Sequence, residues 1–193
     1  MLKIMTRRQF CLGLSSSFGL LSGLAARPNM LSAEELVLEG KFNLVDQYGR
    51  ARTQDDLRGK PTILFFGYTH CPDFCPTVLQ ETALLMREMK QEADKLNFVF
   101  ISIDPERDKP EILKDFLSSF DERIMGLTGT QKQVDAAVES FMAFAERANL
   151  GNSYVYDHST VIYLFDAKGV FQGPLKLGQT LQTVLAQLRA LNG

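Results

Sequence analysis

The stretch Pro61-Thr-Ile-Leu-Phe-Phe-Gly67-Tyr-Thr-His-Cys71-Pro-Asp-Phe-Cys75-Pro76 decides the fold of this chain. The apolar run that ends at Gly67 has the length and the β-branched and aromatic content of a buried strand, and the pattern after Pro76 predicts a helix. Cys71 and Cys75 therefore lie where a strand passes into a helix. Because a helix N-terminus offers unpaired N–H groups and a positive dipole end, we expect it to favour thiolates over thiols.

Length and composition limit the classes of protein to be considered. The chain has 193 residues, of which 45% are apolar, and a formal net charge of -2. We expect residues 27–193 to form a single domain with its own core. No basic cluster follows the N-terminal segment, so nucleic-acid binding is excluded. Because the sequence predicts no extended apolar surface stripe, we expect a monomer.

Residues 1–26 have the pattern of an export signal. Arg7 and Arg8 precede a weakly apolar stretch that ends in small residues at Ala25 and Ala26. This pattern predicts a signal peptide of the twin-arginine type, with cleavage near its end, and a location in the periplasm of a bacterium. A membrane anchor that is retained is the alternative.

The cysteine count indicates sulfur chemistry in one motif. Cys11 would be removed with the signal, which leaves Cys71 and Cys75 in an exported protein. A purely structural disulfide is a weak explanation, because a bridge over so short a loop removes little entropy from the unfolded chain. Redox exchange and metal binding both remain open at this point.

The remaining elements alternate in a way that predicts an α/β protein. Strands 61–67 and 97–103, joined by a helix, should pair in parallel through a right-handed crossover. We expect a thioredoxin-like sandwich with an N-terminal β-hairpin and an inserted extra helix. The other predicted elements are two short strands within 35–46 broken at Gly40, helices 112–120, 131–147 and 180–191, and a hairpin of 160–165 with 170–172.

A charged loop, Asp104 to Glu111, follows the second buried strand. It should lie at the same sheet edge as Cys71, which is where open α/β sheets bind ligands. Asp108 and Glu111 have the spacing of a capping box for the next helix. Docking of a partner or lining of the site is the alternative role for this loop.

The chain contains two histidines, His70 and His158. Neighbouring side chains usually diverge, so His70 is the poorer partner for the thiol of Cys71. His158 follows a polar segment and precedes a strand. The residues alone leave its role open between a hydrogen-bonded turn residue and a ligand.

Four motifs in order resemble the Sco proteins, the copper chaperones of cytochrome oxidase assembly. They are Gly67-Tyr-Thr-His-Cys71-Pro-Asp-Phe-Cys75-Pro76, Asp104-Pro-Glu-Arg-Asp108, Gly126-Leu-Thr-Gly-Thr130 and Asp157-His158-Ser159. The resemblance implies a thioredoxin-like fold in which Cys71, Cys75 and His158 bind copper. It implies as client the dinuclear copper site of cytochrome c oxidase subunit II, with a periplasmic copper donor or a thiol reductant as a further partner.

The chemistry of this residue set agrees with copper. Two thiolates and one imidazole suit Cu(I), with Cu(II) as a second oxidation state, whereas structural zinc generally needs four ligands. Asp157 or Asp73 is a candidate to orient one of the metal ligands without binding the metal itself. The sequence thus favours a periplasmic copper metallochaperone over an enzyme, although thiol-disulfide oxidoreductase activity through Cys71 and Cys75 stays open. The alternative is a thiol-disulfide reductase that keeps the client's copper-binding cysteines reduced.

Overall fold

The computed structural model describes residues 38–175, 179 and 181–191. The chain divides into two units, Met1–Glu35 and Leu36–Gly193, and every element described below belongs to the second. The export signal predicted for residues 1–26, including Cys11, lies outside the described residues. Within the described ranges, no helix is both long and apolar enough to cross a membrane.

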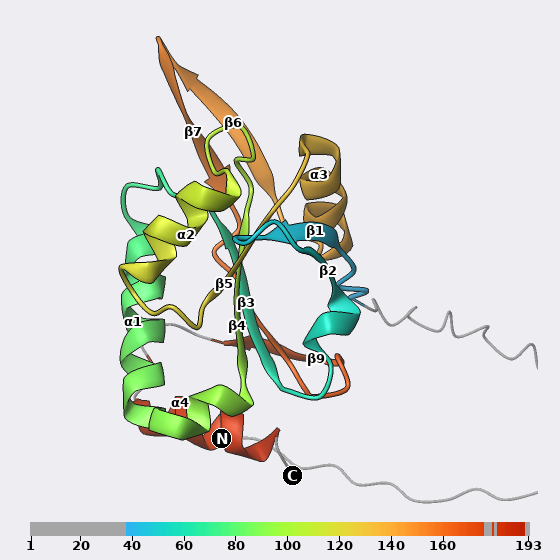
Figure 1. The fold of residues 1–193 in the computed structure, drawn as a ribbon, viewed down its shortest axis with the longest axis vertical. Helices are drawn as coiled ribbons and strands as arrows, with labels where there is room; N and C mark the ends of the chain where they lie inside the picture. Colours follow the sequence, from blue (N-terminus) through green and yellow to red (C-terminus); the bar gives the residue numbers. More distant parts are fainter. Residues whose placement is uncertain (1–37, 176–178, 180, 192–193) are drawn as a thin grey trace, which may run out of the picture. The chain divides into compact units, whose positions relative to one another are not determined.

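A seven-stranded sheet forms the centre of the second unit, with the strand order β2-β1-β5-β4-β3-β8-β9 (Figure 1). Its central strands are β3 (Thr62–Gly67), β4 (Asn97–Ser102) and β5 (Met125–Thr128). They pair in parallel, which confirms the predicted parallel pairing of the first two. All six residues of β3 are buried, as its continuous apolar run predicts. The carboxyl ends of the three strands therefore meet at one edge of the sheet.

Helices cover both faces of this sheet. In Figure 1, α1 and α2 lie on one side and α3 lies on the other. Adjacent phenylalanines of β3 point to opposite faces: Phe65 packs against Phe100, and Phe66 against Phe141, each with ring centroids 5.3 Å apart. The predicted α/β sandwich is confirmed. The bounds are α1 (Phe74–Met89), the short 3-10 helix η2 (Lys90–Lys95), α2 (Pro110–Ser118) and α3 (Gln131–Ser140).

The C-terminal hairpin agrees with the prediction. Strands β8 (Ile162–Phe165) and β9 (Phe171–Leu175) pair antiparallel, and β8 also pairs antiparallel with β3. Gly169 has a φ of +82° in the turn between them, a conformation that favours glycine. Helix α4 (Leu181–Ala190) follows and buries Leu185 and Leu188.

The N-terminal hairpin is present, but its strands differ from the predicted ones. It pairs β1 (Asn43–Asp46) with β2 (Ala51–Thr53), and the 3-10 helix η1 (Gln54–Leu57) follows. Residues 38–42 form no strand. The turn is made by Asp46, whose Oδ1 accepts hydrogen bonds from the backbone N–H groups of Tyr48 and Arg50, each at 2.9 Å. The Asp46 carboxylate closes this turn, and the chain then forms the second strand of the hairpin, β2.

The inserted helix is shorter than predicted. Its start is correct, because the Thr130 hydroxyl accepts a hydrogen bond from the Gln133 N–H in a capping box. The prediction that it continues to Arg147 was wrong: α3 ends at Ser140, and β6 (Ala145–Leu150) begins after Met142, which has a φ of 49°. Strand β6 pairs antiparallel with β7 (Ser153–His158). This pairing overrides the local helical pattern.

Asp46 provides a test of stability against pH. Its carboxylate is buried and also accepts from the Arg52 Nε at 3.0 Å. Burial works to raise the pKa of Asp46, but the N–H groups of Arg50 and Tyr48 and the Arg52 guanidinium outweigh it and hold the pKa below its usual range. Because the pKa of Asp46 is lower in the folded state, its carboxylate stabilises the fold at pH values above the ordinary aspartate pKa. This stabilisation is lost as the pH falls through the lowered pKa.

We therefore expect Asp46→Asn to lower the free energy of unfolding by about 2 kcal/mol at neutral pH. The deficit should shrink as the pH falls below about 4, where the unmodified carboxyl group becomes protonated as well. Urea unfolding of both proteins across this pH range measures the difference. A deficit that stayed constant at every pH would contradict the prediction.

Candidate metal centre

The two cysteines lie in the connection from β3 to α1. After Gly67 the chain makes a turn in which the Cys71 N–H donates to the Tyr68 carbonyl at 3.1 Å. Helix α1 begins at Phe74, slightly earlier than predicted, so Cys75 lies in its first turn. The Cys75 N–H, one of the unpaired donors of the helix start, points to the Cys71 Sγ at 3.5 Å. The predicted placement of both thiols at a strand-to-helix junction is confirmed.

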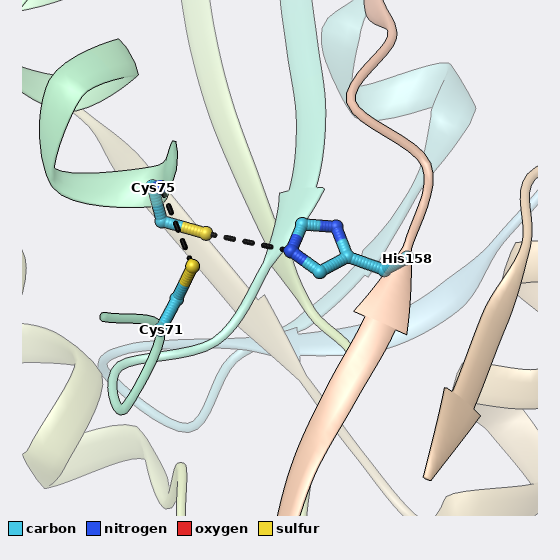
Figure 2. A group of neighbouring side chains, drawn as sticks. All are labelled: Cys71, Cys75 and His158. Carbon is cyan, nitrogen blue, oxygen red and sulfur yellow. Dashed lines mark hydrogen bonds between the residues drawn. The ribbon is translucent and has the colours of Figure 1, made fainter. Parts of the chain in front are cut away.

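His158 reaches the thiols from the end of β7. Its Nε2 lies 3.8 Å from the Cys75 Sγ (Figure 2). The ligand atoms of Cys71, Cys75 and His158 all lie within 4.8 Å of one another. His70 does not belong to this group: its ring is exposed and its Nδ1 lies 2.9 Å from the Thr69 hydroxyl. The structure thus brings together the three predicted residues.

The imidazole of His158 is oriented from both sides. Its Nδ1 lies 2.9 Å from the Ser159 carbonyl oxygen, which can only accept, so Nδ1 donates to it and Nε2 is the ring nitrogen that faces the thiols. The rings of Tyr68 and Phe74 contact it edge-on, with centroids 5.8 and 6.2 Å away. The prediction that Asp157 or Asp73 orients a ligand finds no support at Nδ1, because a backbone carbonyl fills that role.

Burial changes the expected state of Cys75. This residue is fully buried, and burial raises the pKa of its thiol; the neighbouring Cys71 and the charge of Asp108 act in the same direction. The sequence-based expectation of a favoured thiolate at the helix start was therefore wrong for Cys75, because loss of water outweighs the helix dipole. Without a metal this thiol holds its proton, so a metal ion must displace that proton to bind.

Gly67 has a role at this site that sequence reasoning missed. A Cβ at position 67 would lie 2.5 Å from the Cys75 Sγ, which is closer than such atoms approach. The glycine therefore allows the thiol to lie directly against the end of β3. Its position as the last residue of an apolar strand, before a cysteine motif, was the available signal.

Asp108 ties the loop after β4 to the cysteine loop. Its fully buried carboxylate accepts from the Thr69 N–H at 3.0 Å, the Thr69 hydroxyl at 2.6 Å and the Ser102 hydroxyl at 2.6 Å. The capping-box prediction was wrong, because Lys109 is the N-cap of α2 and Pro110 its first residue. Burial raises the pKa of Asp108 against the effect of these donors. The loop after β4 thus holds the cysteine loop in place through Asp108.

This arrangement has two chemical uses. Cys71 and Cys75 are both free cysteines, so together with the His158 imidazole they form a soft donor set for a metal of low coordination number. Two neighbouring thiols are also capable of exchange with a disulfide. The imidazole adds nothing essential to the second use, whereas it completes the first.

Comparisons with known proteins agree on one family. A family model described as SCO1/SenC matches residues 32–192. A SCO2-like protein of Rickettsia prowazekii is 36% identical over 139 residues, which cover 70% of this chain and 68% of the relative. The mitochondrial SCO2 homologue of Homo sapiens is 39% identical over 137 residues, which cover 69% of this chain and 52% of the relative. The chain thus spans about half the length of the human relative.

Solved structures give the same result. Bradyrhizobium japonicum ScoI with copper bound is 44% identical, with a TM-score of 0.76 over 79% of this chain and 98% of that one. Yeast Sco1 with copper bound is 34% identical, with a TM-score of 0.72 over 80% and 87%. These similarities confirm the predicted thioredoxin-like fold.

Proposed function

Because the chain belongs to the SCO1/SenC family, as its four motifs predicted, we propose that it is a copper metallochaperone of the bacterial periplasm. It binds copper through Cys71, Cys75 and His158 and delivers it to the dinuclear copper site of cytochrome c oxidase subunit II. The observation that carries the proposal is the convergence of these three side chains, with their ligand atoms within 4.8 Å of one another.

The donor set selects the metal. Two sulfurs and one nitrogen match the preference of Cu(I) for soft ligands and low coordination numbers, and the same set also accepts Cu(II). Structural zinc sites are almost always four-coordinate, and this group supplies three ligands. Similar copper-bound structures, ScoI of Bradyrhizobium japonicum and Sco1 of yeast, support copper as the cargo.

The three ligands come from two separate segments of the chain, an arrangement that suits transfer of copper by ligand exchange. Both thiols come from one loop and helix, while the imidazole comes from a separate hairpin. The buried Cys75 thiol favours its protonated form, so copper leaves as the proton returns. Cys71 is 8% exposed whereas Cys75 is fully buried, so Cys71 is the cysteine that a client would reach first.

The location and partners follow from this role. An export signal of the twin-arginine type would place the protein in the periplasm, where a thiol reductant has to keep both cysteines reduced and a copper donor has to supply the metal. We propose that it acts as a monomer and binds no nucleic acid. The reductase alternative uses the same two free thiols but requires no contribution from His158.

Anaerobic titration of the reduced protein with Cu(I) tests the proposal. We expect saturation at one copper per chain, and we expect His70→Ala to saturate at the same value because its ring lies outside the ligand group. Saturation well below one copper per chain would count against a chaperone and leave the reductase as the better account. Transfer from the loaded protein to the soluble domain of oxidase subunit II, followed by the absorbance of its dinuclear site, tests the client.

A further inference from the structure

The hairpin that carries His158 is attached to the rest of the protein by side chains. Strands β6 and β7 form a two-stranded sheet of their own, and no backbone ladder joins it to the seven-stranded sheet in the described part of the chain. In Figure 1 this hairpin extends past the end of the large sheet. The distance from His158 to the thiols therefore depends on contacts between β7 and the loops that follow β3 and β4.

One face of β7 makes these contacts. Tyr154, Tyr156 and His158 alternate along the strand and so project from the same face. The Tyr156 N–H donates to the Tyr68 hydroxyl at 3.2 Å, and the two tyrosine rings lie 5.5 Å apart. Tyr68 also contacts the His158 ring, as described above. This middle contact joins the strand to the cysteine loop.

Tyr154, at the end of β7 farther from His158, makes a second set of contacts, which we refer to as the Tyr154 clamp. The Arg107 guanidinium lies 3.8 Å from the centroid of the Tyr154 ring, and the Arg147 guanidinium lies 3.6 Å from it. The Tyr154 hydroxyl donates to the Asp104 Oδ1 at 2.9 Å. The clamp consists of Asp104, Glu106, Arg107, Arg147 and Tyr154.

Charges inside the clamp are paired. Arg107 forms an ion pair with the fully buried Asp104 and donates through Nη1 to the Tyr154 carbonyl at 3.2 Å. Arg147 pairs with Glu106 at 3.0 Å. Burial, the hydrogen bond to Asp104 and its charge raise the pKa of Tyr154 to about 12, so its hydroxyl remains a donor at neutral pH. The clamp thus binds the hairpin to the loop after β4 by stacking, hydrogen bonding and charge.

We propose that the Tyr154 clamp positions His158: Tyr154 and Arg107 hold β7 at the angle that brings the imidazole to the two thiols. This inference rests on the proposed function, since it concerns the same copper site. Tyr154 and His158 are four residues apart on an extended strand, roughly 13 Å, so a small tilt at one end moves the other end appreciably. Tyr154 acts on His158 through the strand, and Arg107 does so through Tyr154 and also through the Tyr68 ring, whose centroid lies 5.7 Å from the Arg107 guanidinium.

A double-mutant cycle with a matched control tests the proposal. We expect Tyr154→Leu to weaken Cu(I) binding about tenfold, which is typical of mutating a residue that orients a metal ligand. Tyr154→Phe should weaken Cu(I) binding less, because it keeps the ring between the two arginines. In a His158→Ala background, Tyr154→Leu should cause no further loss. Tyr48→Leu is the control, because Tyr48 is an exposed tyrosine with Arg50 over its ring at 5.4 Å, on the β1–β2 turn.

A measurement without copper separates failure of this inference from failure of the proposed function. In the reduced, metal-free protein, nuclear Overhauser contacts between the His158 and Tyr68 rings should be present in the unmodified protein and in Tyr48→Leu, and lost in Tyr154→Leu. If the unmodified protein failed to bind copper, these contacts would still test the clamp. Retained contacts in Tyr154→Leu, or an equal loss of affinity with and without His158, would overturn the proposal.

Discussion

The His158→Ala variant is expected to bind Cu(I) at least about a hundredfold more weakly than the unmodified protein. Mutating a residue that only orients a metal ligand already lowers metal affinity about 10- to 100-fold, and this substitution removes a ligand itself. The substitution removes the Nε2 that lies 3.8 Å from the Cys75 Sγ and leaves both thiols in place. The ring is only partly buried, so the fold should tolerate its loss. Anaerobic competition against a Cu(I) chelator of known affinity measures the change.

The same variant separates the chaperone from the reductase. Exchange with a disulfide needs only Cys71 and Cys75, so the rate at which the variant reduces a model disulfide should remain close to that of the unmodified protein. Oxidase assembly in cells should fail. A variant that lost copper but still supported oxidase assembly would contradict the chaperone function. His70→Gln serves as the control, because it removes an exposed imidazole next to Cys71 and should change neither property.

The parallel core of the fold could be predicted because its signals are local and strong. Strands β3 and β4 are continuous apolar runs, and a helix of ordinary length joins them, which leaves parallel pairing as the natural arrangement. The C-terminal hairpin has a glycine in its turn at Gly169. In these segments propensity, hydrophobic pattern and tertiary pairing agree.

The β6–β7 hairpin could not be predicted in the same way. Its first strand, Ala145–Leu150, mixes charged and small residues that also fit the end of a helix. What makes it a strand is pairing with β7, while the Tyr154 clamp fixes the hairpin through contacts with Arg107 from a distant loop. Neither contact is visible in a local window. Asp108 was misread for the same reason, since two of its hydrogen bonds come from Thr69, which lies in the distant cysteine loop.

The metal centre could be predicted in its residues but not in its electrostatics. Cys71 and Cys75 share one motif, and the resemblance to the Sco family brought in His158, which spacing alone left open. The helix start indicated a thiolate, yet the pKa of the Cys75 thiol is raised because the side chain is fully buried. Burial depends on the whole fold, so a sequence pattern indicates the effect of the helix dipole on the thiol but misses the larger effect of its removal from water.

Replacing Gly67 by alanine is expected to damage both the stability and the copper site. A Cβ there would lie 2.5 Å from the Cys75 Sγ and 2.8 Å from the Phe100 ring. Phe100 is fully buried against Phe65, and Cys75 is fully buried in the first turn of α1, so neither can yield easily. Overpacking a core costs about 1–3 kcal/mol, and we expect the upper end, a fall in Tm of roughly 6–12 °C.

A second glycine in the sheet separates the two effects. A Cβ at Gly126, in the neighbouring parallel strand β5, would lie 2.5 Å from the Leu117 Cδ1, the end of a flexible side chain that belongs to α2. Gly126→Ala should therefore lower the Tm, by less than Gly67→Ala, and leave the Cu(I) affinity of the folded protein unchanged. Gly67→Ala should lower that affinity about tenfold or more, because the displaced Sγ is itself a ligand. If folded Gly67→Ala bound Cu(I) as tightly as the unmodified protein, then the Cys75 thiol would have room to move, and the close approach of β3 would not determine where it lies.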